Sequence, residues 1–198
     1  VTKMLPESPR DVLALTATRF PNHDALHIPI SACQHYSSQE ITLSYSELDA
    51  AVSQATEVWR QAGVAGRVAL MLENRPEFFV QWLALKALGI SVIPINHEMP
   101  DAEIPYYLEH GEATAVLTLG AHRTRLINVI ASLTKSIPVI IQDEISSLKL
   151  ADVPAITETT TDSNSECALL YTSGSTGKPK GCLLNNDYFL QQGVWYQN

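Results

Sequence analysis

The sequence predicts an α/β fold, a largely parallel sheet flanked by helices and followed by an antiparallel strand–loop–strand. Three features indicate this fold: a strand–helix–strand pattern over residues 68–95, a weaker repeat of that pattern as far as residue 142, and a glycine-rich loop between two short apolar runs. A chain of 198 residues is long enough for one sizeable core, or for two small lobes that share one.

The first firmly predicted element is a helix that begins after Ser44. Ser44 and Glu47 have the spacing of a capping box, in which each side chain bonds to the backbone N–H of the other residue. Gly63 suits the end of this helix because glycine readily adopts the left-handed conformation of a helix terminus. Between them, apolar residues recur at helical spacing, at Leu48, Val52, Ala55, Trp59 and Ala62.

A strand–helix–strand unit is predicted next. The apolar run 68–72 is typical of a buried strand, and Asn74 and Glu77 are predicted to form a second capping box. The helix ends at Gly89, and a second buried strand occupies 90–95. Strands joined in this way are typical of a parallel sheet. The apolar stripe of the helix consists of Phe78, Trp82, Leu85 and Leu88.

The same pattern continues less distinctly beyond residue 100. A helix is predicted over 101–110, ended by Gly111, and a strand over 114–118. A further helix over 121–133 and a strand over 138–142 complete the α/β unit.

Residues 157–166 (TETTTDSNSE) contain no apolar side chain, so they are predicted to form a solvated linker or loop. The chain then divides into an α/β lobe (1–156), this linker, and a segment (167–198) that contains the glycine-rich loop and begins the next lobe. The last segment contains two short apolar runs and the start of an amphipathic helix, at 167–171, at 182–184 and from about 187.

Composition excludes several classes of function. A net charge of -8 and a pI near 5.1 argue against nucleic-acid binding, which uses clustered Lys and Arg. No apolar run is long enough for a membrane span, and the first twenty residues lack the core of a signal peptide, so we expect a cytoplasmic protein. The cysteines have no metal-ligand spacing and are expected to be small buried or half-buried residues, at Cys33, Cys167 and Cys182. Three isolated histidines are expected to be surface residues or satisfied ones, at His97, His110 and His122.

The strongest functional signal is the loop Ser173–Gly181 (SGSTGKPKG). Its glycines allow backbone N–H groups to approach a ligand closely, and its hydroxyls and two lysines add donors and positive charge. Together these groups favour an anion that carries several negative charges. The spacing differs from that of the Walker A loop. A merely flexible hairpin is the alternative, but it does not need the rigid Pro179 or the buried runs on both sides.

The segment YTSGSTGKPKG resembles the phosphate-loop signature of the adenylate-forming superfamily, which includes acyl-CoA synthetases, peptide-synthetase adenylation domains and luciferases. Residues 43–64 (LSYSELDAAVSQATEVWRQAGV) and 67–96 (RVALMLENRPEFFVQWLALKALGISVIPIN) resemble the segments that usually precede this loop. The resemblance covers about residues 41–189 and identifies the chain as an N-terminal fragment of such an enzyme.

In this superfamily the loop holds the β- and γ-phosphates of ATP while a carboxylate attacks the α-phosphorus. Pyrophosphate leaves, and a thiol, often that of coenzyme A, then takes the acyl group from the adenylate. Asn186 occupies the position of a histidine that usually shapes the carboxylate pocket; an amide can donate a hydrogen bond there but cannot carry charge. The resemblance implies phosphate contacts by Thr172, Ser173, Gly174, Ser175, Thr176, Gly177 and Lys178, with Lys180 facing either toward or away from the phosphates.

The expected activity of the parent enzyme is that of an ATP-dependent acid–thiol ligase with Mg²⁺ and coenzyme A. Alternatives are an adenylation domain that loads an amino or aryl acid onto a carrier protein, and a short non-catalytic nucleotide-binding remnant. The family's adenine, ribose, Mg²⁺ and catalytic lysine motifs do not occur in these 198 residues, so no metal ligand is assigned and the chain alone is expected to be inactive. We also expect it to self-associate through apolar surface that the following lobe would cover.

Overall fold

The computed structural model describes residues 5–147, 161–173 and 177–195. The N-terminal elements are α1 (Pro9–Arg19), β1 (Asp24–Ile28), α2 (Ile30–Cys33), β2 (Ile41–Ser44) and α3 (Tyr45–Ala62). The main sheet and its helices follow as β3 (Arg67–Met71), α4 (Pro76–Ala87), β4 (Ser91–Pro94), α5 (Ile104–His110), β5 (Ala113–Thr118), the 3₁₀ helix η1 (Gly120–His122), α6 (Arg123–Ile130), β6 (Val139–Ile141), the 3₁₀ helix η2 (Gln142–Ser147), β7 (Glu166–Thr172), β8 (Lys180–Asn185) and α7 (Asn186–Trp195).

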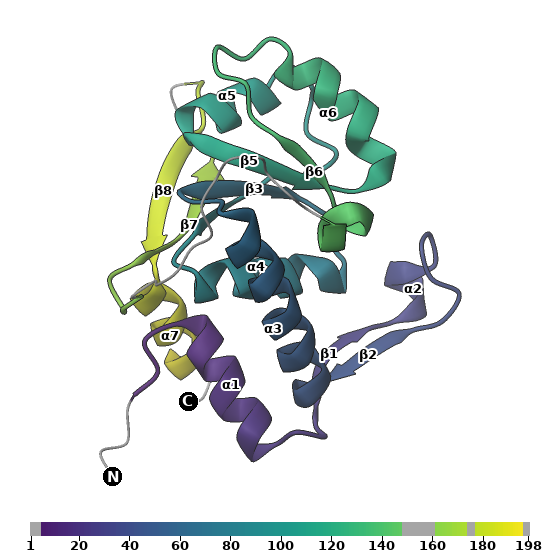
Figure 1. Ribbon diagram of the computed structural model, residues 1–198, viewed down its shortest axis with the longest axis vertical. Coiled ribbons are helices and arrows are strands. Elements are labelled where there is room, and N and C mark those ends of the chain that lie inside the picture. Colours follow the sequence, from purple (N-terminus) through teal and green to yellow (C-terminus); the bar gives the residue numbers. More distant parts are fainter. Residues whose placement is uncertain (1–4, 148–160, 174–176, 196–198) are drawn as a thin grey trace.

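The predicted fold class is confirmed. Six strands form one sheet in the order β6-β5-β3-β4-β7-β8, and every neighbouring pair is parallel except β7 and β8. The helices α3 and α4 lie on one face of this sheet, and α5 and α6 lie on the other (Figure 1). The strands β1 and β2 form a separate antiparallel pair.

The central strand β3 divides its side chains between two cores because successive residues of a strand point to opposite faces. Val68 and Leu70 are fully buried in the cluster that includes α3 and α4, whereas Ala69 and Met71 are fully buried in the cluster that includes α5 and α6. This burial on both faces explains the continuous apolar run that predicted the strand.

The strands β7 and β8 extend the sheet that the preceding residues begin. Ala168 of β7 pairs with Val92 of β4, so the phosphate-loop segment is hydrogen-bonded to the α/β lobe. Within the predicted linker, the residues around Asp162 form a turn, in which the Asp162 carboxylate accepts a hydrogen bond from the backbone N–H of Ser165 at 2.8 Å. Glu166 already belongs to β7. The division of the chain into lobes stays a prediction.

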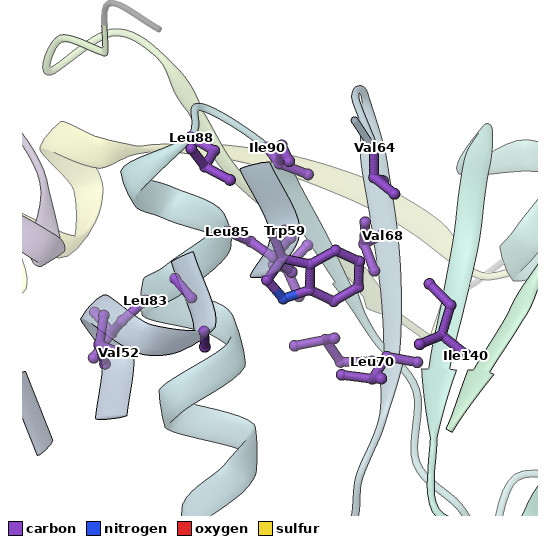
Figure 2. Packing of buried hydrophobic residues seen from close by; sticks show 14 of the residues in the cluster. Val52, Trp59, Val64, Val68, Leu70, Leu83, Leu85, Leu88, Ile90 and Ile140 are labelled. Atoms are coloured by element: carbon purple, nitrogen blue, oxygen red, sulfur yellow. The ribbon is translucent and has the colours of Figure 1, made fainter. Parts of the chain in front are cut away.

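The helix α3 has the predicted start and end. Ser44 and Glu47 form both bonds of the capping box, and Gly63 takes a left-handed conformation with φ 67°. The predicted stripe faces the core, where the indole of Trp59 lies among Val68, Leu70 and Leu85 (Figure 2).

The start of α4 differs from the prediction. Its N-cap is Arg75, which makes no side-chain cap bond, and Pro76 is the first helical residue. The predicted capping box of Asn74 and Glu77 is therefore wrong. Proline fixes φ at a helical value and has no N–H to satisfy, so it can start a helix without a side-chain cap.

Two other helices are shorter than predicted. The helix α5 begins at Ile104 rather than at residue 101. Like α4, it has a proline in its first turn, Pro105. The helix α6 covers only part of 121–133, because Gly120–His122 form a 3₁₀ turn before it and its C-cap is Ala131.

The elements before Ser44 were not predicted. The helix α1 is capped by Ser8 and buries only Leu13 and Ala17, so its apolar periodicity is weak. Arg10 attaches it to α3 through an ion pair with Asp49 at 2.6 Å. Among the residues that the structure describes, no helix has the length and apolar character needed to cross a membrane.

Candidate functional site

The candidate site is the hairpin of β7 and β8, whose connecting loop carries the phosphate-loop sequence. The two strands are antiparallel, and Thr172 pairs with Lys180 at the point where the loop begins and ends. Both residues are exposed, as is Ser173. The loop-bearing end of β8 lies close to α5 in Figure 1.

The structure describes the two sides of the predicted loop. Gly177 has φ 93°, a conformation that side chains other than glycine rarely adopt, and the Lys178 side chain is exposed. The predicted phosphate contacts of Gly174, Ser175 and Thr176 lie outside the described residues. The described donors, the hydroxyls and the ammonium groups at the two sides of the loop, are thus accessible to a ligand.

The second half of the loop rests on α5. The Tyr106 hydroxyl donates a hydrogen bond to the Pro179 carbonyl oxygen at 3.0 Å, and the Lys178 ammonium lies 5.8 Å from the centroid of the Tyr106 ring. Sequence reasoning did not single out Tyr106, because the only signal for it is an aromatic residue on a short, weakly periodic helix.

A close approach within the hairpin explains the glycine that ends the loop. A Cβ atom at Gly181 would lie 2.9 Å from the Leu169 Cδ1 atom and 3.5 Å from the Tyr171 ring. These neighbours occupy the space in which a side chain would stand, so the glycine allows the Tyr171 ring to pack against the backbone of β8.

Tyr171 joins this hairpin to α5. Burial raises the pKa of its hydroxyl to about 12, so the group remains a neutral hydrogen-bonding partner at physiological pH. Its oxygen lies 2.8 Å from Nδ1 of His110, and its ring centroid lies 4.3 Å from that of Tyr107. His110, isolated in the sequence, thus has a partner on the strand that carries the loop.

Two cationic side chains hold the start of β7. The Arg67 guanidinium donates to both carboxylate oxygens of Glu166, at 2.6 and 2.9 Å, and these bonds lower the pKa of Glu166. The Lys86 ammonium donates to the Glu166 backbone oxygen at 2.8 Å, and its burial lowers its pKa to about 8. Lys86 lies among apolar residues in the second half of α4, which is the signal that could have indicated this role.

Asn186, the predicted substrate-pocket residue, lies at the start of α7 and is only 2% exposed. Its Nδ2 donates to the Asp162 backbone oxygen at 2.8 Å, so one part of the amide holds the turn before β7. Its Oδ1 atom is buried and has no hydrogen-bond partner among the described residues. A role of Asn186 toward a substrate stays a prediction.

The histidines that follow β4 and β5 gather around Glu73. The His122 Nε2 atom lies 2.9 Å from the Glu73 carboxylate, and the His97 ring stacks on that of His122 at 5.6 Å. Although burial acts in the opposite direction, the hydrogen bonds from His122 and Arg75 lower the pKa of Glu73. Within the described ranges, no group of three or more His, Cys, Asp or Glu side chains is arranged to hold a metal ion.

Cys33 and Cys167 are buried, as predicted, whereas Cys182 is exposed on β8. A mainly apolar cavity of about 460 Å³ lies between β2, α3, α4 and η2, and none of its lining residues belongs to the hairpin. This cavity is therefore separate from the hairpin that carries the loop.

The fold and the hairpin together define an α/β domain that presents a glycine-, hydroxyl- and lysine-containing loop for an anionic ligand. The family model for AMP-binding enzymes matches residues 13–198, and the chain belongs to this family of adenylate-forming ligases.

Similar proteins include, by name, a tyrocidine synthase and a CoA ligase. The chain is 27% identical to tyrocidine synthase 3 of Brevibacillus parabrevis, over 98% of this chain and 3% of that protein. It is also 27% identical to crotonobetaine/carnitine–CoA ligase of Citrobacter koseri, over 78% of this chain and 32% of that protein. The chain thus spans less than a third of the length of either relative.

Solved structures support the fold. The N-terminal domain of FACL13 from Mycobacterium tuberculosis superimposes with a TM-score of 0.71 and 23% identity, over 91% of this chain and 45% of that chain. The N-terminal subdomain of NpsA from Klebsiella oxytoca gives a TM-score of 0.69 and 22% identity, over 91% and 42% of the two chains.

Proposed function

We propose that the hairpin of β7 and β8 binds the phosphates of ATP in an enzyme that activates a carboxylic acid as an acyl-adenylate. The observation that carries this proposal is the exposure of Ser173, Gly177 and Lys178 at the two described sides of the loop, with Gly177 in a left-handed conformation. Membership of the AMP-binding enzyme family supports the same function.

In the proposed reaction a carboxylate oxygen attacks the α-phosphorus of ATP, and the bond from that phosphorus to the bridging oxygen breaks. Pyrophosphate leaves with the electron pair of this bond. Such a displacement needs the reactants held in line and the negative charge neutralised, rather than a nucleophile from the protein. Lys178 would supply charge to the departing phosphates, while Thr172 and Ser173 would donate hydroxyl hydrogen bonds to them.

Mg²⁺ would accompany ATP and neutralise part of the phosphate charge. Of the described residues beside the loop, Thr172 and Ser173 are exposed and carry hydroxyl oxygens. Neither is a carboxylate, so we assign them to the phosphates and place no metal ligand among them.

For the second half of the reaction we propose transfer of the acyl group to the thiol of coenzyme A. The name of a CoA ligase among the relatives supports this proposal. The alternative is transfer to a carrier protein, which the relatives named peptide synthetases support. The two are distinguished by incubating the enzyme that contains this chain with Mg·ATP, an acid and either acceptor. Acyl-CoA formation supports the first, whereas acyl-carrier formation alone overturns it.

Binding of Mg·ATP to the chain, measured by calorimetry, tests the proposed phosphate site directly. We expect Lys178→Ala to weaken binding by about tenfold, because it removes a charge-assisted contact. The matched control is Lys135→Ala, an exposed lysine in the turn between α6 and β6, which should leave the affinity unchanged. No binding at millimolar ATP, or equal affinities of the two variants, would refute the proposal.

Self-association and a cytoplasmic location also stay predictions. The apolar side chains that support self-association lie on β8 and α7, where Leu183 is 60% and Trp195 is 80% exposed. Light scattering that shows a monomer at high protein concentration would contradict the first expectation.

A further inference from the structure

We propose that Tyr106 of α5 is a positioning residue for the phosphate loop, and this inference rests on the proposed function of that loop. The hydroxyl of Tyr106 holds the loop backbone at Pro179, and its ring keeps the ammonium of Lys178 beside the loop.

The backbone contact fixes the chain between the two loop lysines. The Tyr106 hydroxyl donates to the carbonyl oxygen of Pro179 at 3.0 Å, and Pro179 separates Lys178 from Lys180. Proline already fixes its own φ, so a bond to its carbonyl restrains the remaining free backbone angle of this residue. The hydrogen bond thereby sets the direction in which the loop enters β8.

The ring contact acts on the charged group. The Lys178 ammonium lies 5.8 Å from the Tyr106 ring centroid, within the range of a cation–π interaction. A carboxylate in this position would neutralise the lysine and compete with phosphate. An aromatic face restrains the ammonium without cancelling its charge, so the full positive charge stays available to an anion.

The Tyr106 side chain is itself held in place from the hairpin. His110 follows it by four residues, hence on the same side of α5, and the two rings stack at 5.0 Å with an interplanar angle of 28°. The Nδ1 atom of His110 then lies 2.8 Å from the hydroxyl of Tyr171 on β7. These contacts connect β7 through α5 to Lys178 and Pro179, a geometry suited to holding this part of the loop in one arrangement.

The chain offers a matched control for this tyrosine. The Tyr36 hydroxyl also donates to a backbone carbonyl, that of Asn74 at 3.5 Å, and the Arg75 guanidinium lies 4.0 Å from its ring centroid. Tyr36 follows α2, outside the hairpin. Tyr36→Phe therefore removes a hydroxyl that makes the same kind of contact, at a longer distance, beside a cation, without touching the phosphate loop.

The experiment measures Mg·ATP binding by calorimetry for the unaltered chain and for Tyr106→Phe, Tyr106→Leu and Tyr36→Phe. Tyr106→Phe should weaken binding by roughly three- to tenfold, the effect of one hydrogen bond. Tyr106→Leu, which also removes the ring, should weaken it further, and Tyr36→Phe should change it by less than about twofold. Amide hydrogen exchange at Gly177 and Lys178 should accelerate in Tyr106→Phe while its melting temperature matches that of Tyr36→Phe.

The outcomes separate the two proposals. If the unaltered chain does not bind ATP, the proposed function fails and the role of Tyr106 fails with it. If the chain binds ATP and Tyr106→Phe binds equally well, or if Tyr36→Phe is weakened to the same extent, only the positioning role is overturned. Tyr106→Phe keeps the ring and its packing, so it provides the test even if Tyr106→Leu does not fold.

Discussion

Lys86 provides a quantitative test of the packing at the start of β7, the first strand of the hairpin. Its side chain is 2% exposed, and burial lowers its pKa from the ordinary 10.5 to about 8. Between these two values the folded chain has released the proton from Lys86, whereas the unfolded chain still holds it. The unfolded state therefore binds more protons, and the free energy of unfolding rises with pH.

The size of this rise follows from the two pKa values. At pH 7 the charged side chain costs the folded state about 3 kcal/mol relative to an unperturbed lysine. At pH 9 the folded state is largely neutral at this position, and the cost falls to about 2 kcal/mol. The contribution of Lys86 to the free energy of unfolding thus increases by about 1.3 kcal/mol between pH 7 and pH 9.

Urea unfolding of the unaltered chain and of Lys86→Met at both pH values measures this difference. Methionine keeps the length of the side chain but does not titrate, so the variant should lack the rise of about 1.3 kcal/mol. Groups that do not interact with Lys86 titrate alike in both proteins and cancel. The two groups that Lys86 does influence titrate outside the range from pH 7 to pH 9 in the folded chain, because the pKa of Glu166 is lowered and that of Cys167 is about 11. Lys135→Met, at an exposed lysine, should keep the rise. An equal pH dependence in the unaltered chain and Lys86→Met would refute the reasoning.

Three further substitutions test local interactions. Ser44→Ala removes the cap of α3 and should lower the free energy of unfolding in urea by about 0.5–2 kcal/mol. Gln81→Leu leaves the indole N–H of Trp59, which donates to Gln81 at 2.7 Å, buried without a partner; urea unfolding should show a loss of about 1–3 kcal/mol. Glu166→Gln removes the charge that Arg67 contacts and should cost about 1–2 kcal/mol at pH 7, given the partial exposure of the pair. The pKa of Glu166 in the folded chain is lower than its ordinary value of 4.5. The ion pair therefore contributes its full stability above pH 4.5 and loses it as the pH falls through the lowered pKa, so the melting curves of the two proteins should converge in acid.

The parts of the fold that could be predicted are those in which one local signal decides the structure. The capping box of Ser44 and the left-handed Gly63 set the first and last residues of α3, and both signals are local in the sequence. The start of α4 could not be predicted in the same way, because Asn74 and Glu77 have the spacing of a cap while Pro76 makes one unnecessary. Two local signals competed there, and the proline determined the first residue of the helix.

For the site, the loop could be predicted, but the residues of α5 and β7 that hold it could not. Glycines, hydroxyls and lysines within nine residues indicate an anion site from composition and order alone. Tyr106, His110 and Tyr171 meet only because α5 packs against the β7–β8 hairpin, and Tyr106 lies 73 residues before Pro179. No spacing rule connects such positions, so contacts of this kind become visible only when the sheet order is known.

Arg67 connects the two elements that hold the loop, β7 and α5. It lies at the start of β3, where it pairs with Glu166 at the start of β7 and also donates to the backbone oxygen of Gly111 at 3.1 Å. Gly111 ends α5, and a Cβ atom there would lie 2.5 Å from a backbone oxygen of the helix and 3.2 Å from the Tyr171 hydroxyl. The same guanidinium therefore fixes β7 at one end and the helix that carries Tyr106 at the other. Because both are tied to the central strand, the sheet itself sets the distance between the aromatic side chain and the loop that it holds.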